Sequence, residues 1–233
     1  ATNAEPIARS IAVNKGSDGV GLPFTKRFAD PEIAVRTQFT MAEALFELAK
    51  KHRGLEQESL ARREIAQGRK LLEEAVKDYP NTETRIQADY LLADLDLEFA
   101  NDVKDENMRK RKYLESINRF KDIILTYPDS PYAPKAQYKM ALAYEKMGDI
   151  DQACEEYVKL SYTYPDSDLI AETIARIGNY FAAKGKELET KIAEQTEKRE
   201  IEKYGLLSTN MFRTAADVFS RLAPRFPTPQ RAG

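Results

Sequence analysis

A short aromatic-proline motif recurs along the chain, and it constrains the fold more than any other feature. Proline cannot continue a helix interior, and it moves the residue before it out of the helical region. An Asn, Asp, Ser or Thr after the proline can cap a new helix. Each copy therefore predicts the end of one helix and the start of the next. The copies are Tyr79-Pro80-Asn81-Thr82, Tyr127-Pro128-Asp129-Ser130, Tyr164-Pro165-Asp166-Ser167 and Phe226-Pro227-Thr228.

An apolar stripe of constant spacing precedes every copy of this motif. A small residue is followed four positions later by a large one, and three positions after that by an apolar one, so all three share one helix face. The small residue lets a neighbouring helix approach closely, and the pattern predicts stacked helical hairpins. The four sets are Gly68, Leu72 and Ala75; Ser116, Phe120 and Ile123; Ala153, Tyr157 and Leu160; and Ala215, Phe219 and Leu222.

The segment from Pro134 to Pro165 is the most regular unit. Gly148 can take the left-handed conformation at a helix end, and Asp149 can cap the helix that follows. The spacing of its small and large residues resembles that of the tetratricopeptide repeat, which is about 34 residues long. This general resemblance covers roughly Phe39 to Pro227. The residues at matching positions are Met140, Ala141, Tyr144, Gly148, Ala153, Tyr157, Leu160 and Pro165.

From Tyr127 to Ser167 the sequence is more specifically similar to repeats of bacterial envelope proteins. These are the outer-membrane assembly lipoproteins of the BamD type and the TolA-binding cell-division coordinators. The resemblance implies an all-α fold, a tetratricopeptide-like right-handed superhelix of about four helical hairpins. Because successive motif prolines are 48, 37 and 62 residues apart, the repeats are expected to be extended and irregular.

The resemblance also implies a set of partner-binding residues. In this family the first helix of each hairpin lines a concave face, and its second, fifth and ninth positions point inward. Tyrosines there would give a partner segment large contact area at low entropic cost, although they can also simply pack between hairpins. The arrangement does not reproduce the carboxylate clamp of chaperone-binding relatives. The candidate residues are Gln87, Tyr90, Asp94, Lys135, Tyr138, Leu142, Glu172 and Asn179.

Two parts of the chain depart from the repeat. Residues 1–29 contain glycines and a proline that interrupt any helical period, and they are expected to form an extended or mobile arm before a repeat domain of residues 30–233. Residues 184–204 form a charged helical insertion, either a solvated extension of the two flanking helices or a projecting hairpin that docks a partner. The first of these interpretations is favoured.

Both ends of the sequence suggest a longer parent protein. The chain begins at Ala1 without Met, which indicates a removed signal peptide or an arbitrary boundary. It stops at Gly233, where Phe226-Pro227-Thr228 should introduce another helix. Either the array ends on an exposed apolar edge, or the sequence is one piece of a longer array. We favour the second interpretation.

Composition excludes several classes of function. Cys154 and His52 are the only cysteine and histidine, so disulfide frameworks, histidine-based triads and multi-histidine zinc sites are excluded. The formal net charge of −2 gives no basic footprint for nucleic acid. No Gly-rich phosphate loop or nucleophile elbow is present. We expect no catalytic residue, no metal and no cofactor.

The sequence therefore predicts a non-catalytic protein-protein interaction scaffold that binds segments of other proteins in a concave groove. By resemblance it would act in the bacterial envelope or in outer-membrane protein assembly, in the periplasm or on the inner face of the outer membrane, with the cytoplasm as the alternative. Membrane association would require a removed anchor or a partner, since no transmembrane segment is found. The alternative functions are a self-assembling structural component and, less favoured, the regulatory domain of an enzyme.

Overall fold

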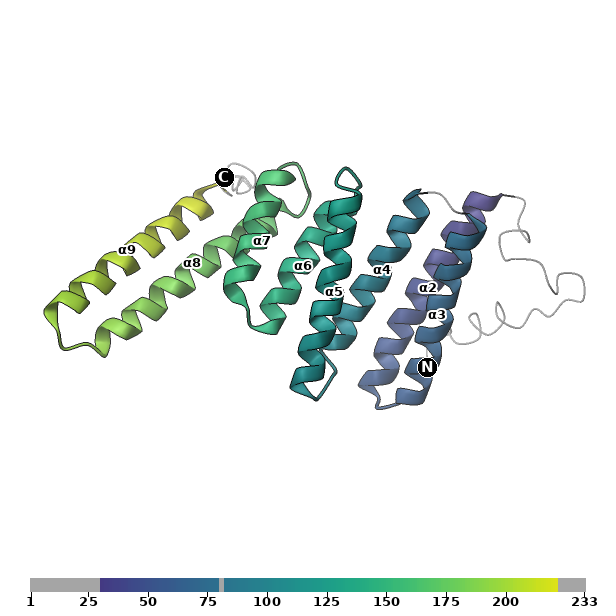
Figure 1. Ribbon diagram of the computed structural model, residues 1–233, viewed down its shortest axis with the longest axis horizontal. Coiled ribbons are helices and arrows are strands. Elements are labelled where there is room, and N and C mark those ends of the chain that lie inside the picture. The colour runs from purple at the N-terminus through teal and green to yellow at the C-terminus, as the bar shows by residue number, and fades with distance from the viewer. Residues whose placement is uncertain (1–29, 80–81, 222–233) are drawn as a thin grey trace, which may run out of the picture. The chain divides into compact units, whose positions relative to one another are not determined.

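The computed structural model describes residues 30–79 and 82–221, and all regular secondary structure in these ranges is helical. This confirms the predicted all-helical fold of hairpins. The N-terminal arm and the Phe226-Pro227-Thr228 motif lie outside the described residues. The helices, labelled in Figure 1, are α2 (Pro31–Gly54), α3 (Glu58–Asp78), α4 (Thr82–Ala100), α5 (Glu106–Thr126), α6 (Ala133–Met147), α7 (Ile150–Thr163), α8 (Ile170–Ala193) and α9 (Lys198–Ser220).

The tyrosine-proline motifs end helices as predicted. Helices α3, α5 and α7 each stop directly before the motif tyrosine, and the backbone N–H of that tyrosine donates to the carbonyl oxygen four residues earlier, at 2.9 Å in all three cases. The capping is different from the prediction. Ser130 and Ser167 each accept a hydrogen bond from the backbone N–H two residues later, at 3.3 and 3.2 Å, and so shape the turn before the next helix.

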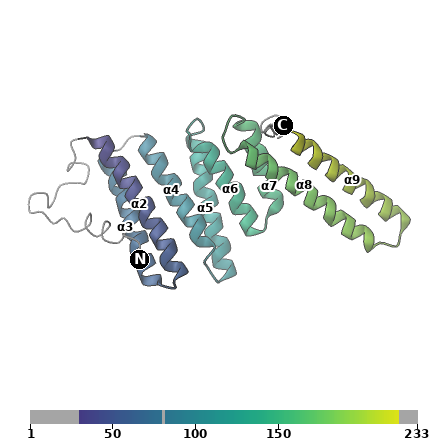
Figure 2. The ribbon, with the colours of Figure 1, turned by 180° about the vertical axis from the view of Figure 1, so that it is seen from behind.

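The chain divides into two compact units, residues 1–88 and 89–233, with the boundary inside α4. In the first unit, α2 and α3 form an antiparallel hairpin (Figures 1 and 2). Its core contains the buried side chains of Phe39, Phe46 and Leu72. Gly68 of α3 faces the ring of Phe46, where a Cβ atom would lie only 2.4 Å from the ring. The small residue of the predicted stripe therefore does permit close helix contact.

In the second unit, each helix from α5 to α9 packs against the next one along the chain. Phe120, Tyr157 and Leu160 are fully buried there. Ser116, a small residue of the stripe, donates a hydrogen bond of 2.8 Å from its hydroxyl to the carbonyl oxygen of Ala93. This bond joins α5 to α4 and satisfies a buried hydroxyl, which would otherwise be costly to bury.

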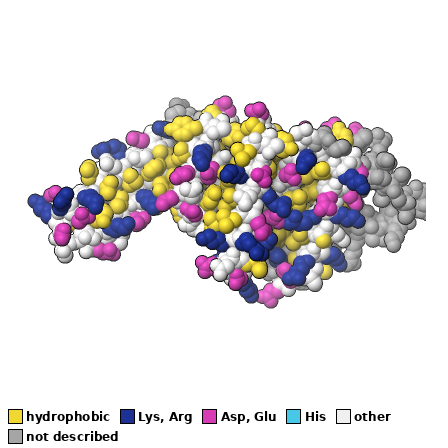
Figure 3. All heavy atoms as spheres, viewed as in Figure 1, with side chains coloured by type: hydrophobic (Ala, Val, Ile, Leu, Met, Phe, Trp, Pro, Cys, Tyr) yellow, Lys and Arg dark blue, Asp and Glu magenta, His cyan; other side chains and the backbone are white. Residues whose placement is uncertain are grey.

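Helices α8 and α9 form a long hairpin (Figure 1), and residues 184–204 comprise the end of α8, the connecting loop and the start of α9. Figure 3 shows apolar side chains gathered along this hairpin between acidic and basic ones. Ser208 of α9 donates to the carbonyl oxygen of Gly185 at 3.2 Å, so a hydrogen bond joins the insertion part of α8 to α9. The insertion thus continues both flanking helices.

Two helices end in the same hydrogen-bond pattern with different residues in the left-handed position. At the end of α6 this residue is Gly148, with φ of 87°, and at the end of α2 it is Glu56, with φ of 59°. A Schellman motif pairs the N–H groups of this residue and the next one with carbonyls of the last helical turn. The bonds are Asp149 to Tyr144 and Gly148 to Glu145 for α6, and Gln57 to His52 and Glu56 to Arg53 for α2.

This difference gives a paired prediction. Gly148→Ala should lower the free energy of unfolding by about 1 kcal/mol, because a Cβ atom disfavours the left-handed conformation. The added Cβ atom would meet nothing within 4 Å, so packing does not contribute to this effect. Glu56→Gly should raise the free energy of unfolding by about 0.5–1 kcal/mol, because it removes a Cβ atom from a left-handed position. Denaturant unfolding followed by circular dichroism measures both. A neutral Gly148→Ala would show that residue 148 is not left-handed in solution.

Candidate partner-binding groove

Helices α6, α7 and α8 of the second unit surround an open groove with a volume of about 460 Å³. Small side chains, Ala153 of α7 and Ala175 and Ala183 of α8, leave this space hollow. Larger and polar side chains form its remaining walls. These are Glu145, Ile150, Cys154, Tyr157, Glu172, Arg176, Asn179 and Tyr180.

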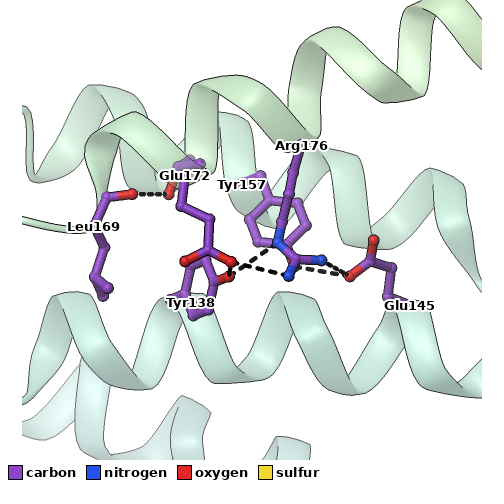
Figure 4. Close-up of polar contacts among 7 residues, drawn as sticks. Tyr138, Glu145, Tyr157, Leu169, Glu172 and Arg176 are labelled. Carbon is purple, nitrogen blue, oxygen red and sulfur yellow. Dashed lines mark hydrogen bonds and ion pairs between the residues drawn. The ribbon is translucent and has the colours of Figure 1, made fainter. Parts of the chain in front are cut away.

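Arg176 organises one side of the groove. It extends from α8 toward α6, between Tyr138 and Glu172 on one side and Glu145 on the other (Figure 4). Its guanidinium donates to the Tyr138 hydroxyl at 2.9 Å and to the two carboxylates, Glu145 at 2.5 Å and Glu172 at 3.0 Å. A planar guanidinium with five donors is suited to such a multiple contact. We call these residues, together with Tyr157, the Arg176 network.

Two tyrosines complete the Arg176 network. Tyr138 donates to Glu172, and Tyr157 donates to Glu145 at 3.0 Å. The guanidinium also lies 5.6 and 5.7 Å from the two ring centroids, within the range of cation–π attraction. The network therefore holds three successive helices together, because Tyr138 and Glu145 belong to α6, Tyr157 to α7, and Glu172 and Arg176 to α8.

The same contacts shift the pKa values of the network. Burial and the hydrogen bond to Glu172 raise the pKa of Tyr138 to about 12, and burial raises that of Tyr157. The hydrogen bond from Tyr138 lowers the pKa of Glu172. Since the folded-state pKa of Tyr138 exceeds its ordinary value of 10.0, its contribution to stability is complete below pH 10 and is lost as the pH rises toward 12. At neutral pH the tyrosines are hydrogen-bond donors.

Replacing Arg176 by Lys tests the network. Because an ammonium cannot reach Tyr138, Glu145 and Glu172 at once, Arg176→Lys should lower the free energy of unfolding by about 1 kcal/mol despite retaining the charge. Arg213→Lys, on the exposed face of α9, is the control and should be nearly neutral. Chemical unfolding of the full chain measures both variants. Equal changes in the free energy of unfolding for the two variants would show that the planar guanidinium of Arg176 contributes nothing to stability beyond its charge.

Tyr180, another residue of the groove wall, belongs to a second polar cluster. Asp151 of α7 accepts from the Tyr180 hydroxyl at 2.9 Å and pairs with Lys184 at 3.1 Å. Cys154 also lines the groove, and burial raises the pKa of its thiol to about 11, so it is protonated and a poor nucleophile at neutral pH. Within residues 30–79 and 82–221, no group of His, Cys, Asp and Glu side chains could hold a metal ion.

Three sequence-predicted site residues meet at the groove. Glu172 and Asn179 line it, and Tyr138 lies beneath it, only 7% exposed and bonded to Glu172. Asn179 is exposed on α8. The resemblance did not indicate Arg176 or Glu145. Arg176 stands four residues after Glu172 on the same helix face, a spacing typical of an ion pair, and this was the signal that could have found it.

The other predicted site residues are not among those that line this groove. Tyr90 packs against the rings of Phe120 and Tyr132, with centroids 6.0 and 5.3 Å away, and its pKa is raised by burial. Asp94 forms an ion pair of 2.6 Å with Lys139. Lys135 is exposed and lies over the ring of Tyr132, and Leu142 is half-buried. Gln87, half-buried, belongs to the first unit.

Comparison with known protein families finds a similarity over part of the chain. Residues 57–159 match the model of the YfiO family, described as an outer membrane lipoprotein. The matched segment reaches from the start of α3 into α7. The chain is thus a helical-repeat protein that resembles the envelope lipoproteins of the BamD type, as predicted. Neither a curated protein nor a solved structure matches it.

In the part of the chain that the structure describes, no helix is long and apolar enough to cross a membrane.

Proposed function

We propose that this chain is a non-catalytic scaffold of the bacterial envelope that binds a segment of another protein in the groove of α6, α7 and α8. The observation that supports this most directly is the groove itself, a hollow of about 460 Å³ whose walls include small residues and the polar side chains of the Arg176 network. The similarity to an outer membrane lipoprotein family supports a role in outer-membrane protein assembly, in the periplasm or at the inner face of the outer membrane.

The charges of the groove indicate what kind of segment fits. Arg176 is matched by Glu145 and Glu172, and Lys184 is matched by Asp151. With two carboxylates against one guanidinium, the Arg176 network keeps one net negative charge, so a partner gains nothing from bringing an anion into this groove. Contact with Ile150 and the small alanines favours apolar side chains, and the exposed amide of Asn179 can bond to a partner backbone in either direction.

The test blocks the groove without disturbing the fold. Ala183 lines the groove and is exposed, so Ala183→Arg places a bulky charge there, and Ala216→Arg on the exposed face of α9 is the matched control. Affinity capture from envelope and cytosol fractions of the source organism compares both variants with the unchanged chain. We expect an envelope partner that Ala183→Arg loses and Ala216→Arg retains. A partner retained by both would overturn binding in this groove.

A self-assembling structural component is the second candidate. Leu206 and Leu207 of α9 are 65% and 39% exposed, and Ile201 and Phe219 are also exposed on this helix. Exposed apolar groups of this kind can drive association between copies. Light scattering over a range of concentrations separates the two functions. Self-assembly would be favoured by a molecular mass that rises with concentration in the unchanged chain and stays that of a monomer in the double variant Leu206→Ser with Leu207→Ser.

A further inference from the structure

Two copies of the tyrosine-proline motif lie next to each other in the second unit and enclose a second hollow. Its volume is about 430 Å³, and it shares no residue with the groove of the proposed function. The Asp129 carboxylate adds to burial in raising the pKa of Tyr164, as expected for loops that lie close together. We call residues 125–130 and 162–168 the loop edge. The hollow is lined by Pro128, Asp129, Ser130, Pro134, Thr163, Tyr164, Pro165, Asp166 and Ser167.

The loop edge presents large apolar side chains at equivalent positions of two repeats. Leu125 and Tyr162 each stand two residues before the motif tyrosine, and they are 69% and 75% exposed. A single exposed apolar residue is ordinary in a soluble protein. Here the same feature recurs in the last turns of α5 and α7, each just before a motif that lines the hollow, so the loop edge offers two equivalent apolar contacts.

Carboxylates accompany these apolar contacts. Asp129, Asp166 and Asp168 are exposed, and the described residues provide no basic side chain in ion-pair contact with them. The motif serines explain why two of these carboxylates are available. Because Ser130 and Ser167 accept the backbone hydrogen bonds of the turns, Asp129 and Asp166 have no role in shaping them. Lys135 is a nearby cation along the chain, and it lies over the Tyr132 ring.

We propose that the loop edge binds an extended basic segment of a partner protein, in which Lys or Arg alternates with apolar residues. The apolar side chains of that segment would contact Leu125, Tyr162 and the motif prolines, and its cations would face the three aspartates. Charge complementarity of this kind sets partner choice and association rate at the rim of an interface. The same three carboxylates repel nucleic acid and anionic lipid headgroups. This surface is independent of the groove.

The test uses the full chain and a short fluorescein-labelled peptide in which lysine alternates with leucine around a central proline. Fluorescence anisotropy gives its Kd. Combining Asp129→Asn, Asp166→Asn and Asp168→Asn should weaken binding about tenfold, since several rim charges act together. The control combines Glu189→Gln, Glu194→Gln and Glu202→Gln, which removes equal charge from the exposed α8–α9 hairpin. It should leave the Kd unchanged. Equal weakening by both sets would overturn the proposal.

Two further measurements separate this surface from general attraction and from the groove. The double variant Leu125→Ser with Tyr162→Ser should also weaken the peptide about tenfold, because both side chains are exposed contacts and not core residues. Ala183→Arg in the groove should not. Hydrogen exchange should show that the bound peptide slows the exchange of backbone amides in residues 125–130 and 162–168. Protection confined to the groove helices, or equal binding of a peptide with glutamate for lysine, would contradict the proposal.

Discussion

Gly68→Ala is expected to lower the free energy of unfolding of the first unit by about 2 kcal/mol. The added Cβ atom would lie 2.4 Å from the ring of Phe46, which is itself buried and only 5% exposed. Forcing an extra methyl group into a packed core typically costs about 1–3 kcal/mol, more than the helix propensity that alanine gains. Hydrogen exchange of peptides from α2 and α3 measures the loss where it arises.

Gly205 of α9 is the matched control for this substitution. It is also helical, but nothing lies within 4 Å of the position of its Cβ atom. Gly205→Ala should therefore raise the free energy of unfolding by about 0.5–1 kcal/mol through helix propensity alone. Adding Phe46→Leu to Gly68→Ala should restore part of the lost stability. If Gly68→Ala were as stabilising as Gly205→Ala, the close contact of α2 and α3 would be wrong.

Two buried glutamines are expected to respond to the same change in opposite directions. Gln38 of α2 is completely buried, and neither amide atom has a hydrogen-bond partner among the described residues. Burying an unpaired amide costs about 1–3 kcal/mol, and methionine has nearly the same shape without the polar atoms. Gln38→Met should therefore raise the free energy of unfolding by about 1–2 kcal/mol.

Gln137 of α6 is the opposite case. Its amide donates to the carboxylate and to the carbonyl oxygen of Glu156, a residue that is itself buried. Gln137→Met would leave that carboxylate with Lys159 as its remaining partner, and should lower the free energy of unfolding by about 2 kcal/mol. Thermal unfolding of both variants checks the pair. A loss of stability in Gln38→Met would mean that its amide has a partner in solution.

The repeat could be predicted because its signals are local. Proline at positions 128 and 165 excludes a continuous helix whatever surrounds it, so the ends of α5 and α7 follow from the sequence. Gly148 at the end of α6 is predictable in the same way, since its left-handed conformation is a property of one residue and its turn. The left-handed Glu56 carries no such signal, since nothing in the local sequence marks a glutamate for a positive φ.

The candidate site was only partly predictable, because position along a helix does not decide what a side chain contacts. Tyr138 and Glu172 were assigned inward positions for binding, but they bond to each other, and Tyr138 is buried beneath the groove. Arg176 stands only four residues after Glu172 on α8, but its bonds to Tyr138 and Glu145 join α8 to α6 at a separation that no local pattern encodes. Tyr90 likewise packs against aromatic rings of α5 and the loop before α6.

The sequence by itself determined the helices and their order, since proline stops, glycine turns and the spacing of apolar residues act within a few residues of the chain. Only the tertiary structure decided which polar groups are matched and which remain available. Arg176 becomes neutralised because three helices bring two carboxylates and a phenol to it, and Asp129 and Asp166 stay available because neighbouring serines take the hydrogen bonds of their turns. These outcomes depend on distances between segments, which only packing establishes.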